Sequence, residues 1–328
     1  MSERSERFAV VGCGMSAKRI HMPELRNAGV DVTVFASRSR SSAEAARDEW
    51  GSGDVSDDWR DAIRRDDVDA VVVATPNSLH HDVAVAAAEN GKHVLVDKPM
   101  ACTPAEADDM IAVAASNDVV VMPFQNTRFL PPFVGAHDAV AAGRIGGVTG
   151  LRAAFGHAGP QAWAPRATWF FDRAVAGGGC LIDLGVHVID LVRWITGHEV
   201  EEVAAFVNGR AGDVEPDAQL LLRLDNGAIG TTHASWSSRP GPDHQFTVVG
   251  TDGTLHLDGR TPLTLTTLDG QRERVELPEA VGSPLGELLA AMRGEREPTL
   301  TAADGRATVA IIDAAYRSAN ERRTVAVL

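Results

Sequence analysis

Short apolar runs alternate with helix-length segments through the first 123 residues, and this alternation limits the fold more than any other feature of the sequence. Strands are expected at residues 7–12, 30–36, 70–74, 93–96 and 119–122. Helices are expected near residues 16–28, 41–50, 58–65, 79–90 and 104–116. Buried strands joined by helices are typical of a parallel sheet covered on both faces. We therefore predict an α/β fold in which residues 1–123 form a doubly wound parallel sheet.

Residues 124–328 follow a different pattern. A helix at 132–142 precedes strand patterns at 148–155, 200–208, 218–224, 228–236, 244–250 and 254–257, and helices at 285–293 and 302–320 close the chain. Asp225-Asn226-Gly227 and Thr251-Asp252-Gly253 favour hairpin turns between neighbouring strands. We predict a second, α+β domain over residues 124–328 with a largely antiparallel open sheet. Its uncovered face would join copies of the chain into a homodimer or homotetramer.

Charge and cysteine content narrow the possible partners. The chain has 328 residues, 44% of them hydrophobic, and a net charge of −14 at pH 7, so neither a nucleic acid nor an anionic membrane is the expected partner. Cys13, Cys102 and Cys180 are too scattered to suggest a disulfide framework or a metal site. The polar start MSERSERF, and the lack of an uninterrupted apolar run of about 18 residues, favour a cytoplasmic location.

A glycine-rich turn joins the first strand to the first helix. It reads GCGMSA, with Gly12, Gly14 and Ala17 at the positions of a G-x-G-x-x-A motif. Glycine permits a tight turn and close approach of the backbone to a pyrophosphate, while the small alanine allows close helix–strand packing. The amides of Met15 and Ser16 lie at the helix N-terminus, which attracts phosphate. The turn predicts a Rossmann dinucleotide-binding domain; the alternative is a small-residue turn that only packs tightly.

The end of the second strand selects the form of the cofactor. An acidic residue there would accept hydrogen bonds from a ribose 2′-hydroxyl and repel a 2′-phosphate. The chain instead reads Ala36-Ser37-Arg38-Ser39-Arg40, and the next carboxylate is that of Glu44. Ser37 can donate to a phosphate oxygen, and Arg38 can grip the phosphate or stack on the adenine. We therefore expect NADP(H) to be preferred over NAD(H), the alternative being a solvated loop.

Two further strand ends belong to the expected cofactor edge, because open α/β sheets bind ligands at the carboxyl ends of their strands. Thr75-Pro76-Asn77 follows one strand, and His80 begins the helix after it. The next strand ends in Asp97-Lys98-Pro99, where the proline holds Lys98 at the strand tip, either extended or at a cis bond. The Lys98 ammonium is expected to contact the nicotinamide carboxamide or a substrate oxygen. The alternative is a solvated surface charge.

The segment Gly177–Trp194 reads GGGCLIDLGVHVIDLVRW and predicts a buried helix after three glycines. The glycines permit close approach to a flat or bulky group. Asp183, His187 and Asp190 fall at i, i+4 and i+7, which places them on one polar stripe. A buried carboxylate one turn before an imidazole can orient it and stabilise its charged form, as a general acid/base requires. The alternative is a hydrogen-bonded core histidine.

Together these motifs resemble the Gfo/Idh/MocA family, named for glucose-fructose oxidoreductase and inositol dehydrogenase, over essentially the whole chain. The resemblance implies that Lys98, Asp183 and His187 are the catalytic lysine, aspartate and histidine. It also implies that the glycine-rich turn is the phosphate loop. The family more often has glutamate where Asp97 stands and glycine where Ala17 stands. Members differ in substrate, so the resemblance does not name one.

The activity implied is reversible hydride transfer between nicotinamide and the carbon of a secondary alcohol or ketone. His187 would exchange the hydroxyl proton, Asp183 would orient it, and Lys98 would stabilise the developing alkoxide. Polar groups that converge in one pocket favour a small polyhydroxylated substrate: a sugar, a cyclitol or a sugar nucleotide. Two alternatives stay open, namely an NAD-recycling redox-coupled lyase or glycosidase and a non-catalytic regulatory binding protein on the same fold.

Three further residues are expected to bind substrate beside Lys98 and the helix residues. Arg128 lies in the segment that leads out of the first sheet, and Trp163 and Trp169 lie in the aromatic segment just before the buried helix. The aromatic segment is expected to form the rim of the substrate pocket. Packing of aromatic rings beneath a loop is the alternative.

Overall fold

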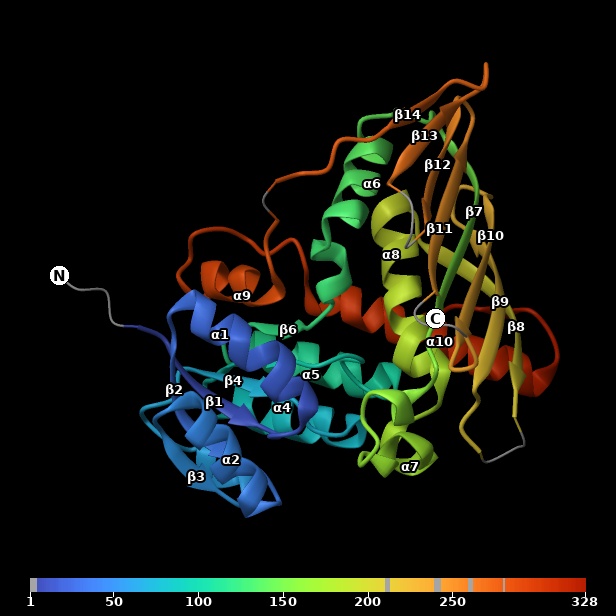
Figure 1. The fold of residues 1–328 in the computed structure, drawn as a ribbon. Coiled ribbons are helices and arrows are strands. Elements are labelled where there is room, and N and C mark those ends of the chain that lie inside the picture. Colours follow the sequence, from blue (N-terminus) through green and yellow to red (C-terminus); the bar gives the residue numbers. More distant parts are fainter. Residues whose placement is uncertain (1–4, 210–212, 239–242, 259–261, 280) are drawn as a thin grey trace. The chain divides into compact units, whose positions relative to one another are not determined.

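The computed structural model describes residues 5–209, 213–238, 243–258, 262–279 and 281–328, and the chain divides into two compact units (Figure 1). The first unit comprises Met1–Gln125 and Ser283–Arg306, and the second comprises Asn126–Gly282 and Ala307–Leu328. Residues 283–306 were expected in the second domain but group with the first unit. The reason is that helix α9 (Pro284–Met292) contacts α1, β5 and β6, and helical periodicity does not reveal which sheet a helix covers.

The first unit is built on a parallel sheet with the strand order β3-β2-β1-β4-β5-β6. Its strands are β1 (Arg7–Val11), β2 (Asp31–Ala36), β3 (Asp54–Ser56), β4 (Ala70–Val73), β5 (His93–Val96) and β6 (Val121–Pro123). The order reverses between β1 and β4, where open α/β sheets bind their ligands. The sequence analysis missed β3, because Asp-Val-Ser offers only one apolar residue.

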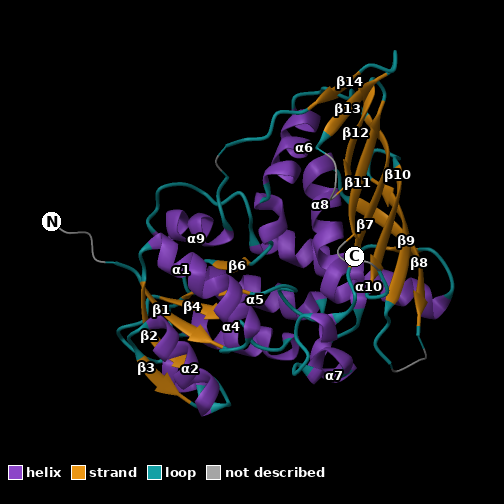
Figure 2. Cartoon of the chain, in the orientation of Figure 1, coloured by secondary structure: helices purple, strands orange, loops and turns teal. Residues whose placement is uncertain are grey.

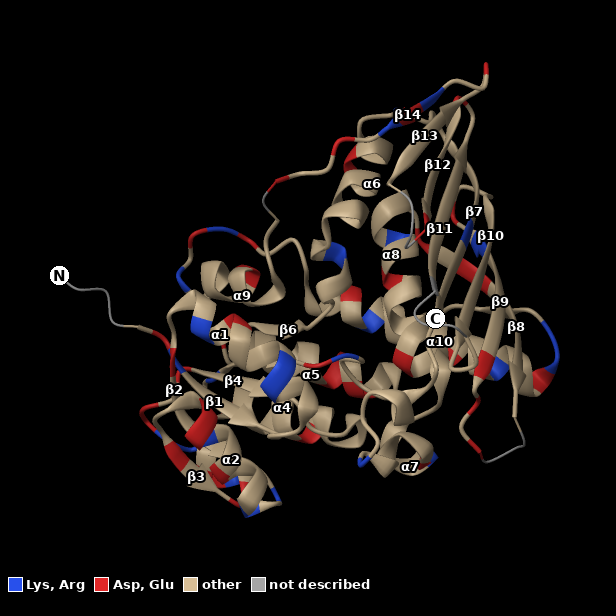
Figure 3. Ribbon diagram, in the orientation of Figure 1, with Lys and Arg blue, Asp and Glu red and all other residues tan. Residues whose placement is uncertain are grey.

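Helices connect the strands of this sheet. They are η1 (Ala17–His21), α1 (Met22–Ala28), α2 (Arg40–Trp50), α3 (Trp59–Ile63), η2 (Asn77–Leu79), α4 (His80–Glu89) and α5 (Pro104–Ser116). Helix α5 begins where predicted, because Thr103 and Glu106 form a reciprocal capping box. The central strand β4 and the edge strand β6 contain no charged residue and are tan in Figure 3, as expected for buried strands.

The second unit is built on a sheet with the order β14-β13-β12-β11-β7-β10-β9-β8-β15, shown in orange in Figure 2. Its strands are β7 (Val148–Gly156), β8 (Val200–Asn208), β9 (Asp217–Leu224), β10 (Ile229–Ser235), β11 (Asp243–Gly250), β12 (Gly253–Asp258), β13 (Thr264–Thr267), β14 (Arg272–Arg274) and β15 (Val325–Ala326). The printed pairings are antiparallel except for β7 with β10. The sheet is therefore mixed but largely antiparallel.

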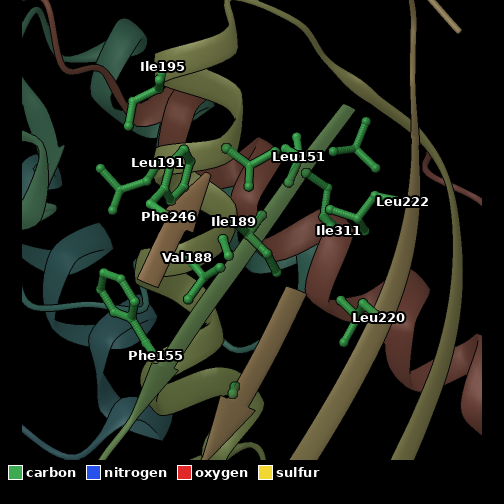
Figure 4. Packing of buried hydrophobic residues seen from close by; sticks show 14 of the residues in the cluster. Leu151, Phe155, Val188, Ile189, Leu191, Ile195, Leu220, Leu222, Phe246 and Ile311 are labelled. Atoms are coloured by element: carbon green, nitrogen blue, oxygen red, sulfur yellow. The ribbon is translucent and has the colours of Figure 1, made fainter. Parts of the chain in front are cut away.

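One face of this sheet packs against helix α8 (Val186–Thr196), and Val188 and Ile189 of this helix belong to the same buried cluster as Leu151 and Leu220 of the sheet (Figure 4). The remaining helices are η3 (Asn126–Phe129), α6 (Pro131–Ala141), η4 (Pro160–Ala162), η5 (Thr168–Phe171), α7 (Arg173–Ala176), η6 (Leu181–Gly185) and α10 (Ala302–Glu321). Helix α10 begins in the first unit and continues in the second after Arg306.

The helical stretch Arg173–Thr196 is apolar and long enough, by length and composition, to cross a membrane, with a mean hydropathy of 1.6 in its most apolar window. It is not an uninterrupted apolar run, because Asp183, His187 and Asp190 lie within it. Within the structure, 83% of the window is buried. Its apolar composition is thus accounted for by packing in the core of the second unit.

Candidate active site

The two glycines of the phosphate loop in the first unit have different surroundings, because Gly12 is tightly packed and Gly14 borders open space. Gly12 has a φ of +93°, and a Cβ there would overlap the carbonyl oxygen of Ala74 at the end of β4. Gly14 is exposed, and a Cβ there would meet nothing within 4 Å. Ala17 is fully buried. Tight packing therefore explains Gly12, whereas the open space at Gly14 fits the approach of a pyrophosphate.

The helix after this loop begins with a π turn, η1, which carries His21 toward the end of β5. His21 is 1% exposed, its Nε2 lies 3.5 Å from Oδ2 of Asp97, and its ring meets Phe124 edge-on at 4.4 Å. Ser16 Oγ donates to the same Oδ2 at 2.5 Å. Burial alone would raise the pKa of Asp97. The nearby His21 imidazole and the hydrogen bond from Ser16 outweigh burial and hold this pKa well below its usual range.

Lys98 stands between two buried anchors at the tip of β5. Its backbone N–H donates to Oδ1 of Asp97 at 3.0 Å, and its bond to Pro99 is cis. His80 is fully buried, with Nδ1 2.7 Å from the carbonyl oxygen of Pro99 and Nε2 3.0 Å from that of Thr75. Burial lowers the pKa of His80, although both hydrogen bonds oppose this shift. The two ring nitrogens of His80 thus contact the backbone of Pro99 and Thr75, and its direct contact with the cofactor stays a prediction.

Two polar side chains near this edge are buried with unsatisfied atoms. Thr75 Oγ1 and both amide atoms of Gln125 have no hydrogen-bond partner within the part of the chain that the structure describes. Asn77 is 8% exposed and begins η2. Buried polar atoms are normally hydrogen-bonded, so these atoms fit a polar ligand such as a dinucleotide at the carboxyl edge of the sheet.

The end of β2 presents cations and no carboxylate. Ser37 is half-buried and Arg38 is exposed. Arg40 forms an ion pair with Glu44 at 3.2 Å, whereas no hydrogen bond or ion pair joins Arg38 to another residue among those that the structure describes. The Arg38 guanidinium is therefore available to an anionic group beside the adenosine end of a dinucleotide.

In the second unit, the three glycines before the buried helix approach groups of the chain itself. Gly177 ends α7 with a φ of +81°. A Cβ on Gly178 would overlap the hydroxyl of Tyr316, and one on Gly179 would overlap the backbone of Glu215. The bulky groups that these glycines accommodate are thus Tyr316 and Glu215, which belong to the same unit.

Glu215 caps the start of the buried helix from a distant part of the chain. It is 2% exposed, and its Oε1 accepts hydrogen bonds from the amides of Gly179 at 2.9 Å and Leu181 at 3.0 Å. The hydroxyl of Tyr316 donates to the same oxygen at 2.8 Å. Burial, with the neighbouring Glu215 charge, raises the pKa of Tyr316. A carboxylate at a helix N-terminus satisfies free amides and complements the helix dipole.

The buried helix opens with a second π turn, η6, so the α-helical spacing predicted for Asp183 and His187 is wrong. A π turn adds one residue to the turn and rotates what precedes it. Asp183 is 6% exposed, its Oδ2 accepts from Trp236 Nε1 at 2.9 Å, and the same oxygen lies 3.5 Å from Nε2 of His157. The Nδ1 of His157 accepts from the backbone of Gly159 at 2.9 Å, so Nε2 carries the proton that faces Asp183.

Residues of η3 hold the next two polar groups of this helix. Thr127 Oγ1 lies 2.9 Å from Nδ1 of His187. Arg128 donates to both carboxylate oxygens of Asp190, at 2.6 and 2.7 Å, and the two side chains are 4% and 1% exposed. The contact at Nδ1 of His187 comes from Thr127, and orientation of this histidine by Asp183 stays a prediction. Arg128, expected to bind substrate, instead lies in a buried ion pair that fixes α8.

The aromatic segment before the helix forms a cluster around Phe170. Trp169 stacks on Phe170 at 3.9 Å, and Trp163, 37% exposed, meets it edge-on at 5.2 Å. Trp163 also lies 6.2 Å from the ring of His157. Both tryptophans therefore pack on Phe170, and Trp163 also contacts His157, which faces Asp183.

Comparison with known proteins settles the family. The model for the oxidoreductase family with an NAD-binding Rossmann fold matches residues 6–125, and the model for the GFO/IDH/MocA C-terminal domain matches residues 133–256. The chain belongs to the Gfo/Idh/MocA family. It is accordingly an NAD(P)-dependent oxidoreductase that acts on CH–OH groups.

Relatives in the family share both units. Myo-inositol 2-dehydrogenase of Thermotoga maritima is 30% identical over 284 residues, which is 82% of each chain. The dTDP-3,4-didehydro-2,6-dideoxy-alpha-D-glucose 3-reductase of Streptomyces antibioticus is 32% identical over 83% of this chain and 80% of its own. The crystal structure of GenD2 from gentamicin A biosynthesis, in complex with NAD, matches with a TM-score of 0.85 and 30% identity over 99% of this chain and 97% of its own.

Proposed function

We propose that this oxidoreductase transfers a hydride reversibly between NADP(H) and the carbinol carbon of a sugar, a cyclitol or a sugar nucleotide. The observation that carries the proposal is the presence of Asp183 and His187 on an otherwise apolar, buried helix. Asp183 accepts a hydrogen bond there from Trp236, and His187 shares one with Thr127. The printed names of the relatives, an inositol dehydrogenase and a nucleotide-sugar reductase, support a polyhydroxylated substrate.

Each side chain has a distinct task in this proposal. The nicotinamide, when bound, accepts or supplies the hydride. His187 exchanges the hydroxyl proton through Nε2, because Thr127 occupies Nδ1. Asp183 binds a neighbouring hydroxyl of the substrate with the carboxylate that Trp236 holds in place. Lys98 stabilises the charge that develops on the reacting oxygen, and the amides of Gly14–Ala17 bind the pyrophosphate.

His187→Ala tests the assignment of the acid/base. General acid/base catalysis contributes about 10²- to 10⁴-fold, so turnover should fall by that factor in a screen of sugars, inositols and sugar nucleotides followed at the reduced-nicotinamide absorbance band. The NADPH dissociation constant should not change. His198→Ala is the control, because His198 pairs with Asp225 on an exposed turn. Unchanged turnover of His187→Ala would reject the assignment.

The preference for NADP(H) rests on Arg38 and on the missing carboxylate at the end of β2. Arg38→Ala should weaken NADPH binding about tenfold, as loss of a charged hydrogen bond to phosphate predicts, while NADH binding changes little. Arg47→Ala is the control, because Arg47 lies on α2 and pairs with Asp48. Tighter binding of NADH than of NADPH by the unaltered protein would contradict this preference, as would equal weakening of both by Arg38→Ala.

The open face of the second sheet supports a dimer or tetramer. Phe206, Leu221 and Ile229 are 83%, 49% and 51% exposed, and the register β8–β9–β10 places all three on the face opposite the core. Adjacent exposed apolar side chains on a sheet are typical of an interface. Phe206→Glu should therefore convert the protein to monomers in analytical ultracentrifugation, and an unaltered protein that sediments as a monomer would rule the proposal out.

A further inference from the structure

The carboxylate of Asp97 joins two parts of the first unit that serve different steps of the reaction. Its Oδ1 accepts the backbone N–H of Lys98 at 3.0 Å. Its Oδ2 accepts the hydroxyl of Ser16, in the phosphate loop, at 2.5 Å, and lies 3.5 Å from Nε2 of His21. One oxygen thus holds the strand tip that carries the lysine, and the other holds the loop that faces the phosphates.

We propose that Asp97 is a positioning residue that couples occupancy of the phosphate loop to the placement of Lys98. The proposal rests on the proposed function, because it requires a dinucleotide at this loop. Asp97 acts through Lys98 and Ser16 rather than on the substrate, since both of its oxygens already bind groups of the protein.

His21 completes the loop side of this connection. The π turn η1 brings it there, and such turns occur frequently at functional sites. Neither of its ring nitrogens has a hydrogen-bond partner within the described ranges, although Nε2 lies 3.5 Å from Oδ2 of Asp97, and the ring lies edge-on against Phe124. The Asp97 carboxylate is therefore the polar group that this buried imidazole faces, and any shift of the η1 turn displaces a neighbour of Asp97.

His80 makes the strand tip stiff enough to transmit a small displacement. It lies 2.7 Å from the carbonyl oxygen of Pro99 and 3.0 Å from that of Thr75. Lys98 is thus held by Asp97 at its own amide and by His80 through the next residue. Close-packed, hydrogen-bonded segments move as units, so a change at Ser16 reaches the backbone of Lys98.

The chain offers a direct probe, because Lys18, Lys92 and Lys98 are its only lysines. Reductive ¹³C-methylation gives three lysine signals in NMR spectra, which Lys18→Arg, Lys92→Arg and Lys98→Arg assign. The ligand is 2′-phospho-ADP-ribose, with ADP-ribose in parallel. Both carry the pyrophosphate but lack the nicotinamide, so they cannot reach Lys98 through the ring. The Lys98 signal should shift on saturation in the unaltered protein, and Ser16→Ala and Asp97→Asn should abolish at least half of that shift.

Kinetics of the unmethylated enzyme give the second measurement. A displaced catalytic group costs about 10- to 100-fold in rate, so Asp97→Asn should lower kcat by that factor while the substrate KM stays within about twofold. Asp97→Glu should restore at least a third of the rate. Asp69→Asn is the matched control, because Asp69 binds Arg7 at the opposite edge of the sheet, and it should change neither kcat nor the Lys98 shift. If Asp97→Asn does not fold, Ser16→Ala still tests the coupling.

The outcomes separate this proposal from the proposed function. Calorimetric binding of either ligand with no shift of the Lys98 signal would overturn the coupling alone. A full shift in Ser16→Ala or Asp97→Asn would do the same. Failure of the unaltered protein to bind NADP(H), NAD(H) and both nicotinamide-free ligands would overturn both.

Discussion

Each unit starts a helix with a glycine-rich turn and a π turn, yet the two turns leave different surroundings. In the first unit, the space beside Gly14 is open, and no side-chain acceptor reaches the amides of Gly14–Ala17 within the described part of the chain. In the second, Gly178 and Gly179 press against Tyr316 and Glu215. The same sequence signal therefore leaves open space in one unit and makes an internal contact in the other.

The difference extends to the charge at the two helix starts. Glu215 supplies a carboxylate that accepts from Gly179 and Leu181. The start of η1 has no such acceptor among the described residues, and free amides at a helix N-terminus favour an anion. A protein carboxylate in the second unit thus takes the place that a cofactor phosphate is proposed to take in the first.

A glycine-to-alanine substitution in each turn tests the difference, and the largest expected loss of stability comes from the turn in the second unit. Gly179→Ala would place Cβ against backbone atoms of Glu215. Backbone atoms, unlike the end of a flexible side chain, cannot move aside easily. Overpacking of this kind costs about 1 to 3 kcal/mol and occasionally more, so the free energy of unfolding of the second unit should fall by about 3 kcal/mol in urea titrations.

Gly14→Ala should behave in the opposite way. Its Cβ has room, so the free energy of unfolding should change by less than about 1 kcal/mol, while the affinity for NADPH falls about tenfold because the methyl group keeps the pyrophosphate at a distance. Equal destabilisation by both substitutions, or full affinity in Gly14→Ala, would remove the distinction between the two turns.

The sequence was sufficient where structure is decided locally. Thr103, Pro104 and Glu106 form a cap within four residues, and α5 begins where this pattern predicts. The phosphate loop was found because Gly12 and Gly14 follow a buried strand. The π turns escaped prediction, because hydrophobic periodicity does not record one extra residue in a single turn.

Contacts that depend on pairing between distant strands were also missed. His157 and Trp236 both reach Asp183, because they follow β7 and β10 and these two strands are parallel neighbours. Nothing in either segment alone reveals that pairing. The roles of Glu215 and Arg128 were hidden for the same reason, since their partners lie 34 to 101 residues away along the chain.

A smaller effect is expected from the carboxylate that distinguishes the second turn. Glu215→Ala removes the acceptor of three hydrogen bonds and leaves buried donors unsatisfied, so unfolding should become easier by about 2 kcal/mol. Glu215→Gln keeps an acceptor oxygen, so its free energy of unfolding should fall by about half as much as that of Glu215→Ala. Glu202→Gln is the control, because Glu202 pairs with Arg223 at the surface, and it should change stability by less than about 0.5 kcal/mol. If Glu215→Ala left the free energy of unfolding unchanged, the start of this helix would need no cap.

The smallest expected effect concerns the hydroxyl of Thr127 on η3, which contacts His187 on the helix that Glu215 caps. Thr127→Val preserves the shape of the side chain but removes the partner of His187 Nδ1, so the imidazole loses orientation while remaining present. We expect kcat to fall about tenfold, less than the loss for His187→Ala, with the NADPH dissociation constant unchanged. Thr196→Val is the control, since its hydroxyl bonds the Val192 carbonyl on the same helix. If both threonine variants retained full kcat, the capped helix alone would orient His187, and the second unit would need no side-chain anchor of the kind that Ser16 and Asp97 provide in the first.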